Sequence, residues 1–465
     1  MIAHEATGRI GGREYTARLE ELPLRHSGGA AQGTLSAFSY TVDAPGRPVL
    51  FLTNGGPGVS SLYLHLSGIG PLRARIPRDP DDDGLPPYGV EESPSTILDV
   101  TDLVFLDAPG TGFGSFSADA DVDAFRSVEG DADAIAGAIS DWVDRHGRWD
   151  SEKFFLGESY GTIRAVFLAT SSHGTDTAPL SGIALLGQAV NIQETLDRPG
   201  SVVGALANLP YKAATAWHHG VGSRGHATVE DAVRAALDFA DSDLALAMLR
   251  GDRLAADERA EIAERLSTMI GIPAADLVGD RLWISKQDFR DRLLAGRSLG
   301  VTDSRYAAPS ADRRAGELSF DASDVALSPR YTAGMPQLLR RLFDTAPDPA
   351  RPYRVSDPDA GRDWRWEEPG GDAFVAYGRP SPFHTYPYAA RLSRWMKQSA
   401  HVRLFIGTGA YDSLTTVGAA EHLLRHWDLP RDRTESHVYA AGHMMYSDPD
   451  VAQQLNADLR AFLLR

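Results

Sequence analysis

Residues 154–165 read FFLGESYGTIRA, an apolar run that leads through Gly157-Glu158-Ser159-Tyr160-Gly161 into a segment of helical character. The pattern Gly-x-Ser-x-Gly between a buried strand and a helix is typical of a nucleophile elbow. Its glycines permit a tight turn that lifts the Ser159 hydroxyl above the edge of a sheet. The amides at the start of the helix then face the negative charge that forms when a serine attacks a carbonyl group. We therefore predict Ser159 as a nucleophile.

Further apolar runs of strand length lie on both sides of this elbow in the chain. Because they are apolar throughout, they predict strands buried on both faces, as in a parallel sheet covered by helices. Segments with apolar residues at helical spacing alternate with them, which favours an α/β fold. Together with the elbow, the pattern predicts an α/β-hydrolase fold with a mostly parallel central sheet flanked by helices. The strand segments are 49–52, 103–106, 154–156, 183–186 and 402–406, and the helical segments are 122–146, 160–170, 415–427 and 449–464.

The N-terminal region and the middle of the chain differ from this pattern. Residues 8–20 and 34–43 alternate polar and apolar side chains, which predicts two antiparallel strands joined through the Gly28-Gly29 loop. Residues 228–270 are charged and helix-rich, and 303–330 are loop-like. We expect three parts, which are a first core part at 1–191, an inserted, mainly helical cap at 192–372 and a second core part at 373–465.

A serine nucleophile of this type needs an acid and a histidine, which follow it along the chain in that order. Asp412 lies in the loop after strand 402–406, where the acid is expected, and His443 follows the last predicted strand. The three positions fit jointly, so we predict a triad of Ser159, Asp412 and His443. The alternatives that stay open are His437 as the base and Asp448 as the acid.

The segment after strand 49–52 is glycine-rich and reads Asn54-Gly55-Gly56-Pro57-Gly58. Consecutive glycines let a backbone amide approach a substrate oxygen closely. Such an amide, with the amide of Tyr160 after the nucleophile, would form an oxyanion hole. A simple tight turn is the alternative interpretation.

The composition limits the classes of partner. The chain has 465 residues and a formal net charge of −17, which disfavours nucleic acid and anionic membranes. It contains no cysteine, which excludes disulfides, thiolate metal sites and a cysteine nucleophile. No metal and no cofactor are expected. Because the first residues show no signal peptide and no apolar run reaches bilayer length, we expect a cytoplasmic protein. The oligomeric state stays open, with a homodimer as one option.

Motifs in both halves of the chain carry a family resemblance. They are 54–61 (NGGPGVSS), Gly70-Pro71, 107–113 (DAPGTGF), 157–161 (GESYG), Asp412 and Gly442-His443-Met444. In this order they resemble the serine carboxypeptidases, peptidase family S10. The segment 210–306 looks like the cap of bacterial members. The resemblance implies cleavage of a C-terminal residue from a peptide through an acyl-enzyme. The expected substrate is a peptide or a small acyl compound.

The resemblance also implies a role for each residue of the site. An exopeptidase must recognise a carboxylate, and a protonated carboxylic acid beside an amide can donate to one. The implied roles are the triad for Ser159, Asp412 and His443, the oxyanion hole for the amides of Gly56 and Tyr160, and substrate binding for Asn54, Gly55 and Glu158.

The chain departs from the family pattern at three positions. Leu52 stands where the family usually has Trp, Val59 where it has Cys, and Gly68 where a second Glu pairs with the Glu before the nucleophile. Two adjacent carboxyl groups share a proton, which raises the pKa of one of them. Without the second carboxyl group, we expect Glu158 to be ionised over more of the working pH range. Blocked substrates, such as esters or amides, would then be favoured relative to free acids.

Two other functions stay open. An acyltransferase or esterase that acts on a small ester or biosynthetic intermediate would use the same triad with a different acceptor. A non-catalytic binding protein of the same fold is disfavoured, because the predicted triad is intact.

Overall fold

The computed structural model describes most of the chain. The described residues are 2–26, 28–78, 80, 84–170, 178–310, 321–345, 348–362, 364–366, 386 and 388–465. The predicted boundary between the cap and the second core part, at residues 372 and 373, lies outside them.

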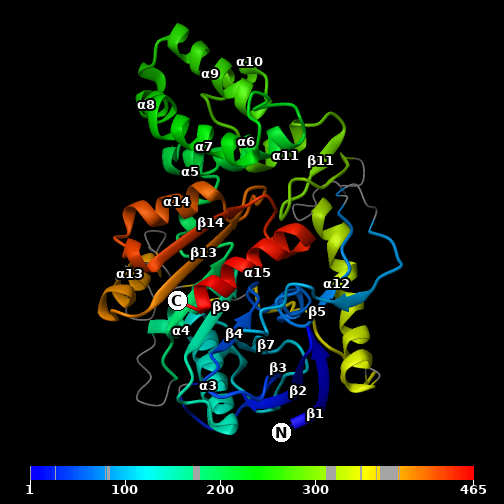
Figure 1. Ribbon diagram of the computed structural model, residues 1–465. Helices are drawn as coiled ribbons and strands as arrows, with labels where there is room; N and C mark the ends of the chain where they lie inside the picture. The colour runs from blue at the N-terminus through cyan, green and yellow to red at the C-terminus, as the bar shows by residue number, and fades with distance from the viewer. Residues whose placement is uncertain are drawn as a thin grey trace.

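Within the described residues, ten strands form one sheet through the middle of the molecule (Figure 1). They are β1 (Ile2–Ile10), β2 (Arg13–Pro23), β3 (Gly33–Thr41), β4 (Val49–Thr53), β7 (Asp102–Leu106), β8 (Ser115–Phe116), β9 (Lys153–Glu158), β10 (Gly182–Leu186), β13 (Arg403–Gly409) and β14 (Thr434–Tyr439). Their order is β1-β2-β3-β7-β4-β9-β10-β13-β14, and β8 pairs with β3. Neighbours from β7 to β14 are parallel, whereas β1, β2 and β3 pair in antiparallel fashion. The predicted α/β-hydrolase fold with a mostly parallel sheet is confirmed.

Helices cover both faces of the sheet, which explains why its central strands are apolar throughout. On β4, Val49 and Phe51 pack into one core cluster, and Leu50 and Leu52 pack into the other. One face is covered by α3 (Val128–His146), α4 (Tyr160–Thr170), α13 (Tyr388–Gln398) and α14 (Val417–His426). The other face is covered by α12 (Ala322–Phe343) and α15 (Pro449–Leu463). The shorter elements of this part are α1 (Leu62–His65), α2 (Val122–Phe125), β5 (Leu72–Ala74), β6 (Val90–Glu92) and the 3-10 turn η7 (Met445–Ser447).

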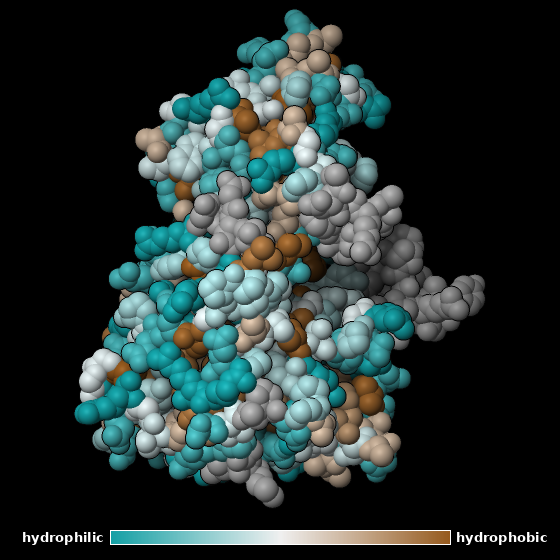
Figure 2. Space-filling model, turned by 90° about the vertical axis from the view of Figure 1, so that its right-hand side faces the viewer, coloured by the Kyte–Doolittle hydropathy of each residue, from teal (hydrophilic) through white to brown (hydrophobic). Residues whose placement is uncertain are grey.

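A separate lobe of helices lies next to α14, at the top of Figure 1. Its own apolar core includes Tyr211, Leu266 and Phe289. Figure 2 shows the lobe from the side, with apolar side chains in small groups on a mostly hydrophilic face. The division of the chain at residues 191 and 372 stays a prediction. The elements of the lobe are α5 (Val202–Ala207), α6 (Leu209–His218), α7 (Val229–Phe239), α8 (Ala245–Arg250), α9 (Ala256–Ile270), α10 (Ala274–Gly279), α11 (Lys286–Arg292), β11 (Arg297–Leu299) and β12 (Ala307–Pro309).

Three local expectations are wrong. The expected strand 8–20 is split into β1 and β2 by a turn at Gly11 and Gly12, which both have positive φ. The expected helix 122–146 breaks into α2 and α3, because the Ser127 side chain accepts from the Gly130 amide and begins a new helix. Part of the segment 303–330 is not a loop, since α12 starts at Ala322 and packs against the sheet rather than in the helical lobe.

Candidate active site

Ser159 lies at the sharp turn between β9 and α4. Its φ is 58°, a left-handed conformation that is uncommon for a residue with a side chain and is typical of a nucleophile elbow. The turn is held from below, because the Ser159 amide donates to the Leu186 carbonyl at the end of β10 (2.9 Å). A side chain at Gly157 would collide with the Gly161 carbonyl at 2.0 Å, so glycine is required there. The sequence thus places the serine at the carboxyl edge of the sheet, where open α/β sheets bind ligands.

Asp412 and His443 meet beside this elbow. Asp412 follows β13 and is fully buried, and its Oδ2 lies 2.7 Å from His443 Nδ1. Its Oδ1 accepts from the amides of Leu414 (2.7 Å) and Thr415 (3.2 Å), so the carboxylate is fixed before any substrate binds. The Thr415 hydroxyl donates to the Oδ2 that faces the imidazole. This arrangement leaves Nε2 of His443 as the nitrogen that can exchange a proton.

His443 Nε2 is buried and has no hydrogen-bond partner among the described residues. The expected bond from the Ser159 hydroxyl is therefore not made in this structure, and such bonds often tighten only when the substrate binds. The imidazole nevertheless lies against the elbow, since a side chain at Gly187, next to Leu186, would meet His443 Cε1 at 2.9 Å. Burial opposes protonation of His443, but the charge of Asp412 outweighs it and raises the pKa to about 9.

The two alternative residues lie elsewhere. His437 is on β14 between Glu435 and Asp458, at 3.7 and 3.6 Å. Asp448 accepts from the amides at the start of α15 and forms an ion pair with Arg305 (2.9 Å). The Asp412 carboxylate, and not that of Asp448, contacts the imidazole of His443.

The glycine-rich loop packs directly on the elbow. A side chain at Gly55 would meet the Tyr160 amide nitrogen and the Glu158 carbonyl at 2.6 Å, so only glycine permits this approach. Among the described residues, the amides of Gly56 and Tyr160 have no hydrogen-bond acceptor. Two free amides beside Ser159 are what an oxyanion hole needs, and this role stays a prediction for both.

Asn54 and Glu158 form a buried pair next to the serine. Asn54 Nδ2 donates to Glu158 Oε1 (3.0 Å), and the orientation of this amide is fixed because its Oδ1 accepts from the Leu64 amide (2.9 Å). Burial raises the pKa of Glu158 to about 7, against the lowering effect of positive charge on His443. The expectation that Glu158 is ionised over more of the pH range is therefore wrong. Desolvation, with a smaller contribution from the charge of Asp412, keeps this carboxyl group largely protonated below about pH 7.

Neither Gly68 nor His65 contributes to this pair. A side chain at Gly68 would point at Ser93 Oγ (3.0 Å) and Arg73 (3.4 Å). His65 stacks on Phe105, its Nε2 lies 2.7 Å from the Tyr40 hydroxyl, and burial lowers its pKa to about 3.

Three supporting groups were not predicted from the sequence. The first is Arg164 on α4, which is fully buried, forms an ion pair with Asp131 (2.6 Å) and donates to the Asn54 carbonyl (2.7 Å). It ties the glycine loop to the helix of the elbow. The signal in the sequence is an arginine inside an otherwise apolar helix. A buried charge of this kind requires a partner.

The second group is Thr415, described above, and the third is Asp107. Asp107 accepts from the Ser61 amide (2.8 Å) and the Ser36 and Tyr353 hydroxyls (2.6 and 2.7 Å). Burial raises its pKa to about 6. Through Asp107, the motif at 107–113 therefore holds the end of the glycine-rich segment at Ser61.

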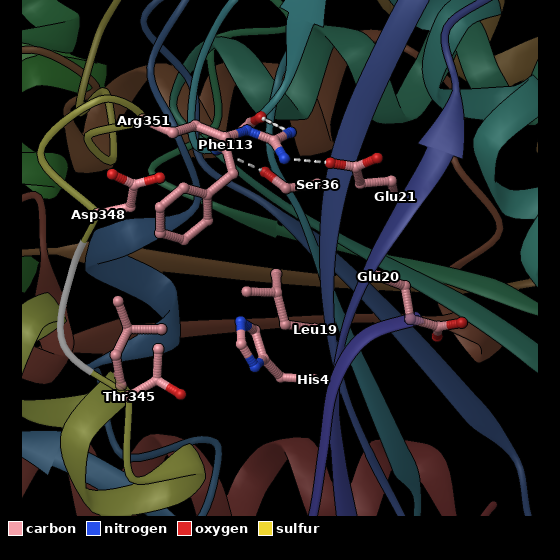
Figure 3. Close-up of a pocket in the computed structure, with 10 residues that line it drawn as sticks. His4, Leu19, Glu20, Glu21, Ser36, Phe113, Thr345, Asp348 and Arg351 are labelled. Atoms are coloured by element: carbon pink, nitrogen blue, oxygen red, sulfur yellow. Dashed lines mark hydrogen bonds and ion pairs between the residues drawn. The ribbon is translucent and has the colours of Figure 1, made fainter. Parts of the chain in front are cut away.

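A separate cavity of about 190 Å³ opens between β1, β2 and the segment near Arg351 (Figure 3). Arg351 forms an ion pair with Glu21 at its wall. No predicted site residue lines this cavity. Among the described residues, no group of three or more His, Asp or Glu side chains could hold a metal ion. No helix in the described part of the chain is long and apolar enough to cross a membrane.

Comparisons with known proteins give a family and a fold. Residues 37–187 match the family model described as serine carboxypeptidase, which covers the glycine loop and the elbow. Among solved structures, the chain is similar to Kex1Δp, a prohormone-processing carboxypeptidase from Saccharomyces cerevisiae, with a TM-score of 0.52 and 13% identity over 97% of this chain and 91% of that chain. A thermostable carboxyl esterase from Bacillus coagulans gives a TM-score of 0.39 and 12% identity, over 96% of this chain and 98% of that chain. A proline iminopeptidase from Mycobacterium smegmatis gives a TM-score of 0.37 and 14% identity, over 96% of this chain and 97% of that chain.

Proposed function

We propose that this chain, whose residues 37–187 match the serine carboxypeptidase family model, removes the C-terminal residue from a peptide through an acyl-enzyme. The observation that carries the proposal is the buried Glu158, directly before Ser159 and hydrogen-bonded to Asn54. A neutral carboxylic acid there can donate a hydrogen bond to the free carboxylate that marks the end of a peptide.

The proposed chemistry follows from the order of the groups. Nε2 of His443 takes the hydroxyl proton as Ser159 Oγ attacks the carbonyl carbon, and Asp412 stabilises the imidazolium that forms. The amides of Gly56 and Tyr160 receive the oxyanion. His443 then gives the proton to the leaving amine, which departs as the C-terminal amino acid. Water repeats the same steps on the acyl-enzyme and restores Ser159.

Peptide mass spectrometry tests this proposal. Wild-type protein is incubated with peptides that share one sequence and end in a free acid, an amide or a methyl ester. We expect stepwise loss of C-terminal residues from the free acid below about pH 7, where Glu158 is neutral. Cleavage of the ester alone, at every pH, would contradict a carboxypeptidase and favour the esterase or acyltransferase alternative.

Two further points belong to the same proposal. A cytoplasmic location stays a prediction, which cell fractionation would test. The substrate is a peptide or small acyl compound, and a homodimer stays an option that light scattering would settle.

A further inference from the structure

Two buried polar groups next to the Asn54–Glu158 pair make no hydrogen bond of good geometry among the described residues, although they lie close enough to influence each other's pKa. They are Glu158 Oε2 and the Tyr446 hydroxyl. A buried polar group without a partner is costly, and most such groups in proteins are paired with protein or with a ligand. Two of them in one place, beside a predicted nucleophile, therefore indicate a ligand that carries hydrogen-bonding oxygens.

Tyr446 is held rigidly in this position. It lies in η7, three residues after His443, and only 4% of its surface is exposed. Its ring packs edge-on against Tyr331, with centroids 6.4 Å apart. The Tyr331 hydroxyl points away from this contact, to Ser447 Oγ at 3.1 Å, so the burial and ring packing of Tyr446 hold it in place. The Tyr446 hydroxyl thus cannot swing out to solvent to find a partner.

The hydroxyl faces both members of the buried pair. Tyr446 interacts with Glu158 and Asn54, and burial together with the charge of Glu158 raises the pKa of Tyr446 well above its ordinary value. The group therefore keeps its proton over the whole working pH range and acts as a donor. Glu158 Oε2 is the second donor at low and neutral pH, because burial also keeps that carboxyl group protonated.

The geometry points to Tyr446 as a specificity-determining residue that donates, together with Glu158, to the terminal carboxylate of the substrate. Two donors match the two oxygens of one carboxylate. One of the two N–H groups of the Asn54 amide donates to Glu158 and holds it in place. Family members usually pair the Glu before the nucleophile with a second Glu. In this chain the Tyr446 hydroxyl takes the place of that second carboxyl group as a hydrogen-bond donor to the substrate. The inference rests on the proposed function, since it assigns a further residue to the same substrate group.

The test compares wild type with Tyr446→Phe, which removes only the hydroxyl. Steady-state kcat and KM are measured for an N-blocked dipeptide with a free acid and for its methyl ester. For the free acid we expect KM to rise about tenfold or more, as for the loss of a hydrogen bond to a charged group, with kcat little changed. Kinetics on the ester stay at wild-type values, because the ester offers no carboxylate.

The matched control is Tyr331→Phe. Its hydroxyl lies against Ser447 and its ring is in the same cluster. This change should leave the acid-to-ester ratio of kcat/KM as in wild type. Labelling of Ser159 by a fluorophosphonate, which carries no carboxylate, checks that each variant is folded.

A pH profile separates substrate binding from a purely structural role. The interaction with Tyr446 lowers the pKa of Glu158, so its removal should raise that pKa and move the rise in KM for the free acid to higher pH. Equal losses on acid and ester, or no change on either, would overturn the inference. Wild-type protein that releases no C-terminal residue would overturn the proposed function and the inference with it.

Discussion

The two sides of the site differ in how completely their polar groups are paired. On the acid–base side, every contact of the Asp412 carboxylate is made, to His443, to the Thr415 hydroxyl and to two backbone amides, and the unpaired atom is His443 Nε2, which exchanges the proton. On the carboxylate side, Glu158 Oε2 and the Tyr446 hydroxyl are buried and unpaired. Machinery that must keep one geometry is satisfied by the protein itself, whereas a recognition surface leaves its donors for the ligand.

The largest expected effect is on the acid–base side. Ser159→Ala should lower kcat by a factor on the order of 10⁶, because it removes the nucleophile of a triad that works as a unit. A fluorophosphonate should label Ser159 in wild type and nothing in the variant, as read by peptide mass spectrometry. Labelling of another serine, or retention of more than trace turnover, would contradict the triad.

A pH series compares the two sides directly. Glu158 must be neutral to bind a carboxylate, so recognition of a free acid should be lost as the pH rises through about 7. His443 must be neutral to act as a base, and its pKa is raised to about 9, so turnover of esters should rise with pH over the same range. The charges of the two groups influence each other, so they titrate as a pair, and protonation of Glu158 favours the neutral imidazole.

The measurement is the ratio of kcat/KM for a free acid to that for its matched ester. Above the pKa of Glu158, at about 7, this ratio should fall by about tenfold for each pH unit, because the neutral fraction of Glu158 falls by that factor. The range from pH 5 to 9 extends about two units on either side of the pKa of Glu158. A ratio that stays constant over this range would show that Glu158 takes no part in recognition of the carboxylate.

A smaller effect tests how the acid is held. Thr415→Val removes the hydroxyl that donates to Asp412 Oδ2 and should lower kcat by about tenfold on acid and ester alike, with little change in KM. Thr408→Val is the control, because that hydroxyl on β13 is buried without a partner among the described residues. It should leave kcat unchanged and keep or raise the melting temperature. An equal loss of kcat in both variants would show that the Thr415 substitution acts through packing and not through the orientation of Asp412.

The smallest expected effect is at Gly68. Its φ is 93°, so Gly68→Ala should cost about 1–2 kcal/mol of unfolding free energy in a denaturant titration. Gly137→Ala in α3, where an added methyl group meets nothing within 4 Å, should instead gain up to about 1 kcal/mol. Gly68→Glu should leave the acid-to-ester ratio unchanged, because residue 68 faces Ser93 and Arg73. A restored preference for free acids would contradict this.

The sequence predicts the sheet and the acid–base side well, because both depend on local patterns. Apolar runs such as 49–52 report burial on two faces, and Gly157 and Gly161 report a turn that only glycine permits. Asp412 and His443 follow strand ends, and parallel strands bring such ends together at one edge.

The carboxylate side could not be predicted in the same way. The protonation of Glu158 depends on burial by residues far away in the chain, and Tyr446 reads as one more aromatic residue after the histidine. The hairpin at Gly11-Gly12 was missed for a different reason, since its strands continue the same alternation on both sides of the turn. The start of α12 follows a polar stretch with no apolar periodicity.

The backbone around His443 is tied to the segment that leads back from the helical lobe. The His443 amide donates to the Thr302 carbonyl (2.6 Å), and the Gly442 amide donates to Asp303 (3.2 Å), which forms an ion pair with Arg305. A side chain at Gly442 would collide with Asp303. Protein engineers who exchange the lobe between homologues to alter substrate range should therefore place the second crossover before residue 301. A graft that carried foreign residues at 302–305 would change the support of the imidazole along with the specificity.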